Sequence, residues 1–354
     1  MHFPSDDELM AGPNALDDFD LDFDDADVEN YETTGALPAG ANAVAGSLVD
    51  ASYPEDFRAG FIAIVGRPNV GKSTLTNALV GSKIAITSMR PETTRHNVRG
   101  VVHGDDFQLV VVDTPGYHRP RTLLGRRLNE MVRESLAEVD LIVFCLPSDQ
   151  KVGPGDEFIA RQIRGLRSPV VAVATKADKV KPERMLEHLQ DIDKLGDFAA
   201  IVPVSAHKNQ QIDVLTRVLA DHMPKSPPLY PQDIYSDEPR DVMIAELIRE
   251  AALEGVRDEL PHSLAVQVEE VVERPTKPGQ KYPPMLDIHV NLYVERDSQK
   301  AIIIGKGGSR LKQVGTRARI AIEEMLKRRI YLDLHVRTAK DWQSDPKMLG
   351  KLGF

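Results

Sequence analysis

The strongest constraint on the fold of this chain is a glycine-rich segment between a short apolar run and a helix-forming run. It reads Gly66-Arg67-Pro68-Asn69-Val70-Gly71-Lys72-Ser73 and continues with Thr74. The apolar run 61–65 predicts a buried strand, and residues 72–80 predict a helix. In such a unit the loop N–H groups and the helix N-terminus bind phosphates, Lys72 reaches the terminal phosphates, and the Ser73 hydroxyl binds Mg²⁺. A chance turn is the alternative. The flanking strand and helix favour a phosphate-binding loop, in which Lys72 is also catalytic.

Three further motifs each follow an apolar run, and they are Asp113-Thr114-Pro115-Gly116, Thr175-Lys176-Ala177-Asp178 and Ser205-Ala206. Asp113 is predicted to hold Mg²⁺ through a water, and the Gly116 N–H to sense the γ-phosphate during catalysis. An Asp178 carboxylate accepts hydrogen bonds from guanine N1–H and the 2-amino group, a pair of donors that adenine lacks. A backbone N–H of Ser205-Ala206 is placed to reach guanine O6. Parallel strands bring their carboxyl ends to one edge of a sheet, so the motifs together predict a guanine-nucleotide site.

Residues 91–96 lie between the first two motifs and form the expected switch segment. A switch needs a hydroxyl that binds Mg²⁺ and releases it when the γ-phosphate is lost. Thr94 is the predicted metal ligand and catalytic residue, with Thr93 as the second candidate. Ras-like GTPases place a water-orienting Gln directly after their Asp-x-x-Gly motif, where this chain has Tyr117, so we expect slow hydrolysis. His118 is either a catalytic base or, more simply, a solvated loop histidine.

Charge and proline content divide the chain into five parts. Residues 1–57 contain 15 Asp and Glu and no Lys or Arg, whereas the rest of the chain contains 39 acidic and 44 basic residues. Such an acidic segment is expected to be disordered, either as a solubilising tail or as an arm that competes for a basic surface. Strands that alternate with helices predict a parallel sheet, and five prolines in 223–239 predict a semi-rigid linker. The predicted parts are the acidic tail (1–57), a three-layer α/β domain with a mostly parallel sheet (58–222), the linker (223–239), a small α+β domain (240–345) and a C-terminal tail (346–354).

Residues 240–345 predict the order helix, strand, strand, helix, helix, strand around the sequence Gly305-Lys306-Gly307-Gly308. Small residues let a nucleic-acid backbone approach, and the adjacent helix N–H groups can bind its phosphates. Residues 296–329 contain ten basic and three acidic residues, which is the electrostatic pattern of a polyanion-binding surface. A solvated basic helix face is the alternative. We predict RNA contacts at Gly305–Gly308, Arg310 and Lys312, with no evident aromatic stacking surface.

These residues closely resemble the Era family of bacterial GTPases over about 58–345. The quoted motifs carry the resemblance, together with the run 83–88, residues 93–95 and residues 299–308. It implies a P-loop GTPase domain followed by a type II KH domain, whose partners are the 3′ end of 16S rRNA and the assembling 30S subunit. In related GTPases an Asn at the position of Asn69 helps to hold K⁺, which acts like an arginine finger; simple loop hydrogen bonding is the alternative. The family usually has Asn at Thr175, so weaker guanine affinity is expected.

The leading hypothesis is a Mg²⁺-dependent GTPase switch in which GTP or GDP alters the link between the two domains and so RNA binding. A scaffold that binds RNA and scarcely hydrolyses GTP is one alternative. A membrane-associated signalling GTPase is another, because basic patches adhere to anionic lipid. No obligate protein partner is evident. Cys145 is the only cysteine and no apolar run reaches the roughly 20 residues of a membrane span, which favours the cytoplasm, with peripheral association at the inner face of the cell membrane as the variant.

Overall fold

A computed structural model of the chain describes residues 53–86, 95, 97–117, 120, 122–254, 260–275 and 284–354. Residues 1–52 of the predicted acidic tail, the switch candidates Thr93 and Thr94, and His118 therefore lie outside the described residues. The part from Ala51 to Phe354 is one compact unit. Both of its domains are described below.

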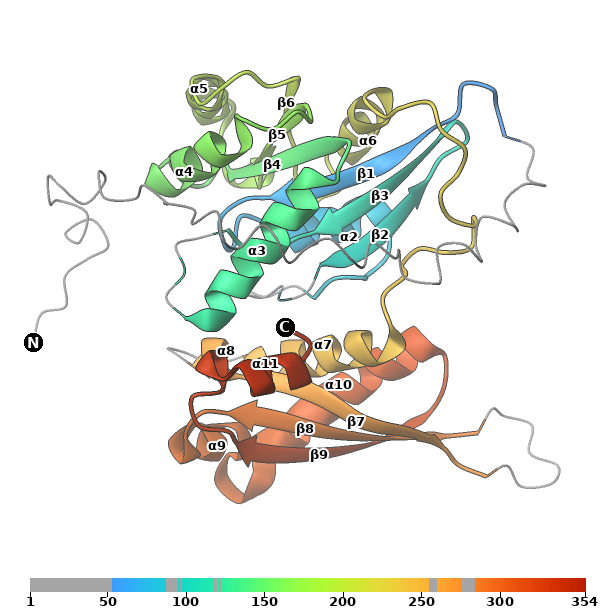
Figure 1. The fold of residues 1–354 in the computed structure, drawn as a ribbon, viewed down its shortest axis with the longest axis vertical. Coiled ribbons are helices and arrows are strands. Elements are labelled where there is room, and N and C mark those ends of the chain that lie inside the picture. Colours follow the sequence, from blue (N-terminus) through green and yellow to red (C-terminus); the bar gives the residue numbers. More distant parts are fainter. Residues whose placement is uncertain are drawn as a thin grey trace, which may run out of the picture. The chain divides into compact units, whose positions relative to one another are not determined.

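Six strands form the sheet of the first domain, in the order β2-β3-β1-β4-β5-β6 (Figure 1). They are β1 (Arg58–Val65), β2 (Val98–His103), β3 (Phe107–Asp113), β4 (Leu141–Pro147), β5 (Val170–Thr175) and β6 (Ala200–Pro203). Neighbouring strands run parallel except β2 and β3, which are antiparallel. Strand β2 is absent from the sequence prediction, because Arg99 and Gly100 interrupt its apolar pattern.

Helices cover both faces of this sheet, which confirms the three-layer prediction. Successive strand residues point to opposite faces, so Ile62 and Ile64 pack on one side and Ala63 and Val65 on the other. The first side is covered by α2 (Lys72–Val80) and α6 (Ile212–Asp221), and the second by α3 (Leu123–Ala137), α4 (Pro154–Ile163) and α5 (Pro182–Asp193). This arrangement leaves the carboxyl ends of β1, β3, β4, β5 and β6 at one edge of the sheet.

The proline-rich segment 223–239 lies along the outer strand β2. The Val101 N–H donates to the Tyr235 carbonyl at 2.9 Å, and the Ser236 hydroxyl donates to the Arg99 carbonyl at 2.9 Å. Because these bonds pair the exposed edge of β2, the linker is fixed to the first domain and also protects a sheet edge from pairing with another chain.

The second domain is a three-stranded sheet backed by two long helices. Its elements are α7 (Arg240–Leu253), α8 (Leu260–Ser263), β7 (Ala265–Glu273), β8 (Leu286–Val294), α9 (Asp297–Ile304), α10 (Ser309–Leu326) and β9 (Ile330–Thr338). β8 runs antiparallel to β7 and parallel to β9. Helices α7 and α10 bury their apolar side chains against the same sheet face, for example Ile248 and Val314 against Val290. The predicted α+β order is confirmed.

Residues 346–354 are not a free tail. Pro346–Lys351 form helix α11, in which Asp345 caps the first turn by accepting from the Lys347 N–H at 2.9 Å. Leu349 and Leu352 are buried in a cluster with Trp342. Because this short helix contributes apolar side chains to a core, the last residues of the chain belong to the folded part.

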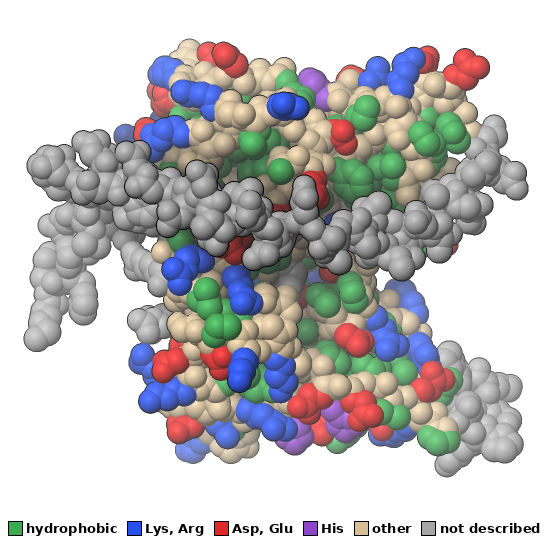
Figure 2. Space-filling model, viewed as in Figure 1, with side chains coloured by type: hydrophobic (Ala, Val, Ile, Leu, Met, Phe, Trp, Pro, Cys, Tyr) green, Lys and Arg blue, Asp and Glu red, His purple; other side chains and the backbone are tan. Residues whose placement is uncertain are grey.

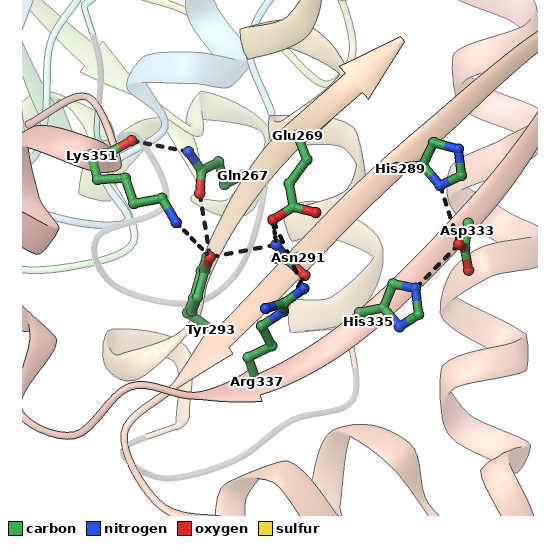
Figure 3. Close-up of polar contacts among 9 residues, drawn as sticks. All are labelled: Gln267, Glu269, His289, Asn291, Tyr293, Asp333, His335, Arg337 and Lys351. Carbon is green, nitrogen blue, oxygen red and sulfur yellow. Dashed lines mark hydrogen bonds and ion pairs between the residues drawn. The ribbon is translucent and has the colours of Figure 1, made fainter. Parts of the chain in front are cut away.

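The sheet face opposite α7 and α10 is polar. Figure 3 shows Asn291 of β8 between two neighbours: its amide donates to Glu269, and its oxygen accepts from Arg337 Nε at 2.7 Å. His289 and His335 lie 3.2 Å and 3.1 Å from the same oxygen of Asp333. Figure 2 shows acidic, basic and histidine side chains intermixed over the domain that holds this sheet. With both signs of charge together, this face lacks the single-sign field that a polyanion needs.

Candidate nucleotide site and nucleic-acid interface

The glycine-rich loop between β1 and α2 is shaped by residues with left-handed backbone angles. Gly66, Asn69 and Gly71 have φ angles of 155°, 62° and 99°. A Cβ on Gly66 would lie 2.8 Å from the carbonyl oxygen of Cys145 and 2.9 Å from Val70 Cγ2, so only glycine fits there. The loop ends on the N-terminus of α2, where backbone N–H groups and the helix dipole favour an anion.

Lys72 is the buried cation of this loop. Its side chain is 6% exposed, and its Nζ donates to the carbonyls of Gly66 and Arg67 at 3.1 Å each. Burial lowers the pKa of Lys72, and the nearby Asp113 carboxylate opposes that shift. A phosphate held by the loop would add negative charge beside Nζ and so favour its charged form.

Two side-chain contacts fix the loop from either side. The Thr175 hydroxyl donates to the Val70 carbonyl at 2.6 Å, and the Thr175 carbonyl itself accepts from the N–H and hydroxyl of Ser148 at 2.9 Å and 2.8 Å. On the other side, Arg67 Nε donates to the buried Asp156 carboxylate at 2.7 Å. The Thr175 hydroxyl therefore bonds to the phosphate loop. It does so with a side chain shorter than the Asn that is usual at this position in the family.

Ser73 and Asp113 provide oxygen ligands of the type that Mg²⁺ prefers. Ser73 is partly exposed in the first turn of α2, and Asp113 is fully buried at the end of β3, beside Val98 of β2. A cluster of three or more His, Cys, Asp or Glu side chains that could hold a metal is not found among the described residues. Thr94, the other predicted ligand, lies outside the described residues.

The motif after Asp113 packs against the phosphate loop through its backbone. The buried Thr114 hydroxyl donates to the Ile64 carbonyl at 2.7 Å, so only the backbone of Thr114 is available to a ligand. A Cβ on Gly116 would lie 2.9 Å from Pro68 Cγ. Because no larger residue fits, the Gly116 N–H and the loop are held at close range.

The residues predicted to recognise the base lie just after the ends of β5 and β6. The buried Ser205 hydroxyl donates to Asp178 Oδ1 at 2.6 Å, and this bond holds the pKa of Asp178 below its ordinary value. The other carboxylate oxygen is left for a base. Lys176 has a left-handed backbone, and its ammonium lies 3.4 Å from the Asp149 carboxylate. Ala206 follows Ser205 and is partly exposed.

Tyr117 is part of the hydrophobic core. It is 2% exposed, its ring stacks on Phe158 at a centroid distance of 5.6 Å, and its hydroxyl accepts from Arg133 Nε at 3.2 Å. The Tyr117 N–H donates to the Gly66 carbonyl at 3.3 Å. The residue that replaces the water-orienting Gln is therefore packed away from the loop edge, where an attacking water would need it.

The sequence Gly305–Gly308 connects α9 to α10 and borders a groove of about 420 Å³ between α10 and β9. Gly305, Gly307 and Gly308 have φ angles of 73°, 59° and 76°, which explains the glycines. Lys306, Lys312 and Arg319 are exposed, and the last two line the groove. Tyr331 also borders the groove and is half exposed, but the Arg274 guanidinium lies over its ring, with Cζ 5.4 Å from the ring centroid. Four nucleotides are the usual capacity of such a loop and groove.

Arg310 has a different place from the one expected. Its Nη2 donates to the carbonyls of Ala252 and Glu254 at 3.1 Å and 2.9 Å, and its Cβ lies where a side chain on Gly305 would clash. These bonds attach the start of α10 to the end of α7. Arg310 thus supports the glycine loop, and Arg319 joins Lys312 as a basic residue that lines the groove.

Four residues of these sites escape motif reading. Asp156 binds Arg67 from 89 positions away, and Ser148 binds Thr175 from 27 positions away. Arg319 and Tyr331 are ordinary helix and strand residues in sequence. A weak signal exists for Asp156 alone: a Gly-Pro-Gly-Asp turn that opens a helix places a carboxylate in the first turn.

The comparisons with known proteins match both domains. A family model described as a 50S ribosome-binding GTPase matches residues 61–176, and a KH-domain model matches residues 259–343. GTPase Era of Mycobacterium avium is 59% identical over 302 residues, covering 84% of this chain and 99% of that protein. GTPase Era of Streptomyces coelicolor is 60% identical over 303 residues, covering 84% and 95%.

Two solved structures are similar over the same share of the chain. One is Era in complex with MgGDPNP and nucleotides 1506–1542 of 16S ribosomal RNA, with a TM-score of 0.79 and 39% identity over 84% of this chain and 99% of the other. The second is an Aquifex aeolicus Era variant bound to GDP·AlF4⁻, with a TM-score of 0.79, 38% identity and the same coverage. With these relatives matched almost end to end, and with the GTPase and KH models both matched, the chain belongs to the Era family of GTPases.

Proposed function

We propose that this GTPase binds GTP or GDP with Mg²⁺ at the carboxyl edge of its six-stranded sheet and hydrolyses GTP slowly. The single observation that supports this most is the Ser205-held Asp178 carboxylate, which is placed to accept from guanine, in the same domain as the Lys72 loop. A relative of this chain was solved with MgGDPNP, and another with GDP·AlF4⁻. A guanine nucleotide with Mg²⁺ therefore accounts for the base-binding, phosphate-binding and metal-binding residues together.

The proposed roles follow the geometry. Loop residues Gly66–Thr74 enclose the phosphates with their N–H groups, and Lys72 supplies the positive charge. Ser73, Asp113 and Thr94 would hold Mg²⁺, which neutralises phosphate charge when bound. Asp113–Gly116 orient the γ-phosphate end, and the Gly116 N–H is the candidate donor to it. Thr175, Lys176, Asp178, Ser205 and Ala206 bind the guanine end.

Slow hydrolysis follows from Tyr117. A side chain that orients the attacking water contributes much of the rate in Ras-like GTPases, and here its position is occupied by a ring packed on Phe158. The water must be oriented by backbone groups, by a partner or by K⁺ held with the help of Asn69. Asn69 has a left-handed φ of 62°, a conformation that Asn adopts more readily than other non-glycine residues.

We also propose that the KH domain binds the 3′ end of 16S rRNA and that the protein assists 30S subunit assembly in the cytoplasm. Lys306, Lys312 and Arg319 supply phosphate contacts around the glycine loop. The similar Era structure contains nucleotides 1506–1542 of 16S ribosomal RNA. RNA crosslinking in cells tests this, with Gly307→Asp as the control that places a negative charge in the loop. Crosslinks spread over unrelated RNAs in the wild type would contradict the assignment.

The proposed domain limits are 1–57, 58–222, 223–239 and 240–345, with the acidic part as a solubilising tail and residues 346–354 as a helical extension packed on the folded part. Nucleotide exchange is proposed to change RNA affinity. A scaffold with little hydrolysis is the second candidate, supported by the buried Tyr117. Single-turnover hydrolysis with and without 30S subunits separates the two, because a scaffold hydrolyses in neither case.

No helix in the described parts of the chain is long and apolar enough to cross a membrane. Peripheral membrane association is tested by liposome co-sedimentation.

A further inference from the structure

A series of contacts runs from the nucleotide domain to the glycine loop of the KH domain. It begins at Arg95, which lies three residues before Val98, the β2 residue that pairs with Asp113. Arg95 is only 1% exposed despite its length and charge. Its Nη1 donates to the Leu264 carbonyl at 2.7 Å, and its Cζ lies 5.6 Å from the centroid of the Trp342 ring. A guanidinium of the GTPase domain is therefore buried among groups of the KH domain.

Trp342 receives a second contact from the nucleotide domain. The residue is fully buried, and Leu124 and Leu128 of α3 pack in the same apolar cluster. Helix α3 is the first helix after Asp113–Gly116, and Arg95 precedes the strand beside Asp113. Arg95 and helix α3, which flank the proposed Mg²⁺ and γ-phosphate residues, therefore both pack around the Trp342 ring.

From Trp342 the contacts continue into the RNA-binding part. Trp342 Nε1 donates to the Ser263 carbonyl at 2.9 Å, and the Ser263 hydroxyl accepts from Gln299 Nε2 at 2.8 Å. Gln299 Oε1 in turn accepts from the N–H groups of Glu295 and Arg296 at 2.9 Å and 3.0 Å, which caps the start of α9. Helix α9 ends at Ile304, directly before Gly305.

We propose that Arg95, Trp342 and Gln299 are positioning residues for the Gly305–Gly308 loop, through which the nucleotide state sets RNA affinity. This inference rests on the proposed function, since it requires both GTP and RNA binding. Its physical basis is that all three residues are nine-tenths buried or more, that Arg95 contacts the Trp342 ring, and that Ser263 accepts hydrogen bonds from both Trp342 and Gln299. A close-packed cluster moves between discrete arrangements, so a shift of Arg95 is passed to α9.

The chain offers a direct optical readout, because Trp342 is its only tryptophan. In the full-length protein we expect its emission to change when GDP is exchanged for GDPNP. Arg95→Gln removes the cation beside the ring and is expected to abolish that change, whereas Arg95→Lys keeps a cation and is expected to retain part of it. Lys83→Ala is the matched control: Lys83 also joins the two domains, by donating to the Glu250 carboxylate of α7, but contacts no member of this series.

RNA affinity is the second readout, measured with a 3′-terminal 16S rRNA fragment in both nucleotide states. We expect the wild-type dissociation constants to differ by at least about fivefold, the lower end of typical coupling between two sites. Arg95→Gln and Gln299→Ala are expected to reduce the ratio to less than about twofold, while Lys83→Ala keeps it. Gln299→Ala acts after Trp342, so it should lose the RNA effect and keep the emission change, which a merely structural role would not do.

The outcomes separate the two proposals. If the wild type binds the fragment equally well with GDP and GDPNP, or if Arg95→Gln keeps the wild-type ratio, the inference is wrong and RNA binding stands. If Lys83→Ala loses the ratio as fully as Arg95→Gln, general domain packing explains the effect and the inference is again wrong. If the wild type does not bind the fragment in either state, the proposed RNA function itself fails. Thermal melts check folding, and Gln299→Ala and Arg95→Lys carry the test if Arg95→Gln does not fold.

Discussion

Replacing Thr175 by valine removes one hydroxyl and keeps the shape of the side chain. Thr175 is 4% exposed, and its hydroxyl donates to the Val70 carbonyl at 2.6 Å, the bond that joins the guanine end of the site to the phosphate loop. Loss of a buried hydrogen bond that leaves one partner behind costs about 1–3 kcal/mol. That is about a 5- to 150-fold change in an equilibrium constant.

The cost divides between two measurable quantities. If the loop keeps its shape in Thr175→Val, the free energy of unfolding falls; if the loop relaxes, nucleotide binding must order it again and the dissociation constant for GDP rises. We therefore expect the two losses to sum to about 1–3 kcal/mol, measured by urea unfolding and by displacement of a fluorescent GDP analogue. Thr175→Ser keeps the hydroxyl and is the matched control. Unchanged stability and affinity in Thr175→Val, or equal losses in Thr175→Ser, would refute the reasoning.

Three further predictions concern the base, the RNA groove and K⁺. Ser205→Ala removes the donor that lowers the pKa of Asp178; a carboxyl with a higher pKa is protonated at higher pH, so GTP affinity should begin to fall at a higher pH than in the wild type, as a titration of the dissociation constant between about pH 4 and 7 would show. Lys312→Ala is expected to lower the slope of log affinity against log salt for single-stranded RNA by about 0.7, whereas Arg310→Ala should lower the unfolding temperature and leave the slope unchanged. Hydrolysis by the wild type should be faster in KCl than in NaCl, and Asn69→Ala should remove the difference; equal wild-type rates would exclude a K⁺ role.

The nucleotide motifs could be predicted from sequence because each is a short run of consecutive residues with its own backbone geometry. Gly66, Gly71 and Lys72 carry out their roles within one loop, and Asp178 is recognised by its distance from Lys176. The fold class followed for the same reason, since alternating strands and helices can be identified locally. The motifs come together in space because each one follows the carboxyl end of a parallel strand in the same sheet.

Contacts between distant residues could not be predicted in this way. Arg310 has the composition of an RNA-binding residue, yet it is bonded to carbonyls 56 and 58 positions away. Trp342 near the C-terminus shows no pattern in sequence, and only the fold places it under Arg95. Strand β2 could not be predicted because its pairing with β3 outweighs the weak strand preference of Gly100. Charge and residue type indicate which contacts a side chain can make. The packing of the fold determines which of those contacts it does make.

The burial of Tyr117 has a consequence for the timing of the protein's cycle. A glutamine at this position would leave a gap beside Phe158 and remove the hydroxyl that Arg133 contacts, so the simplest change toward a faster Ras-like enzyme would first loosen the core. The lifetime of the GTP form is thus not adjusted by that side chain. We expect that lifetime to depend on any partner or ion that binds at the loop edge and orients the attacking water. Hydrolysis would then follow the binding of that partner or ion.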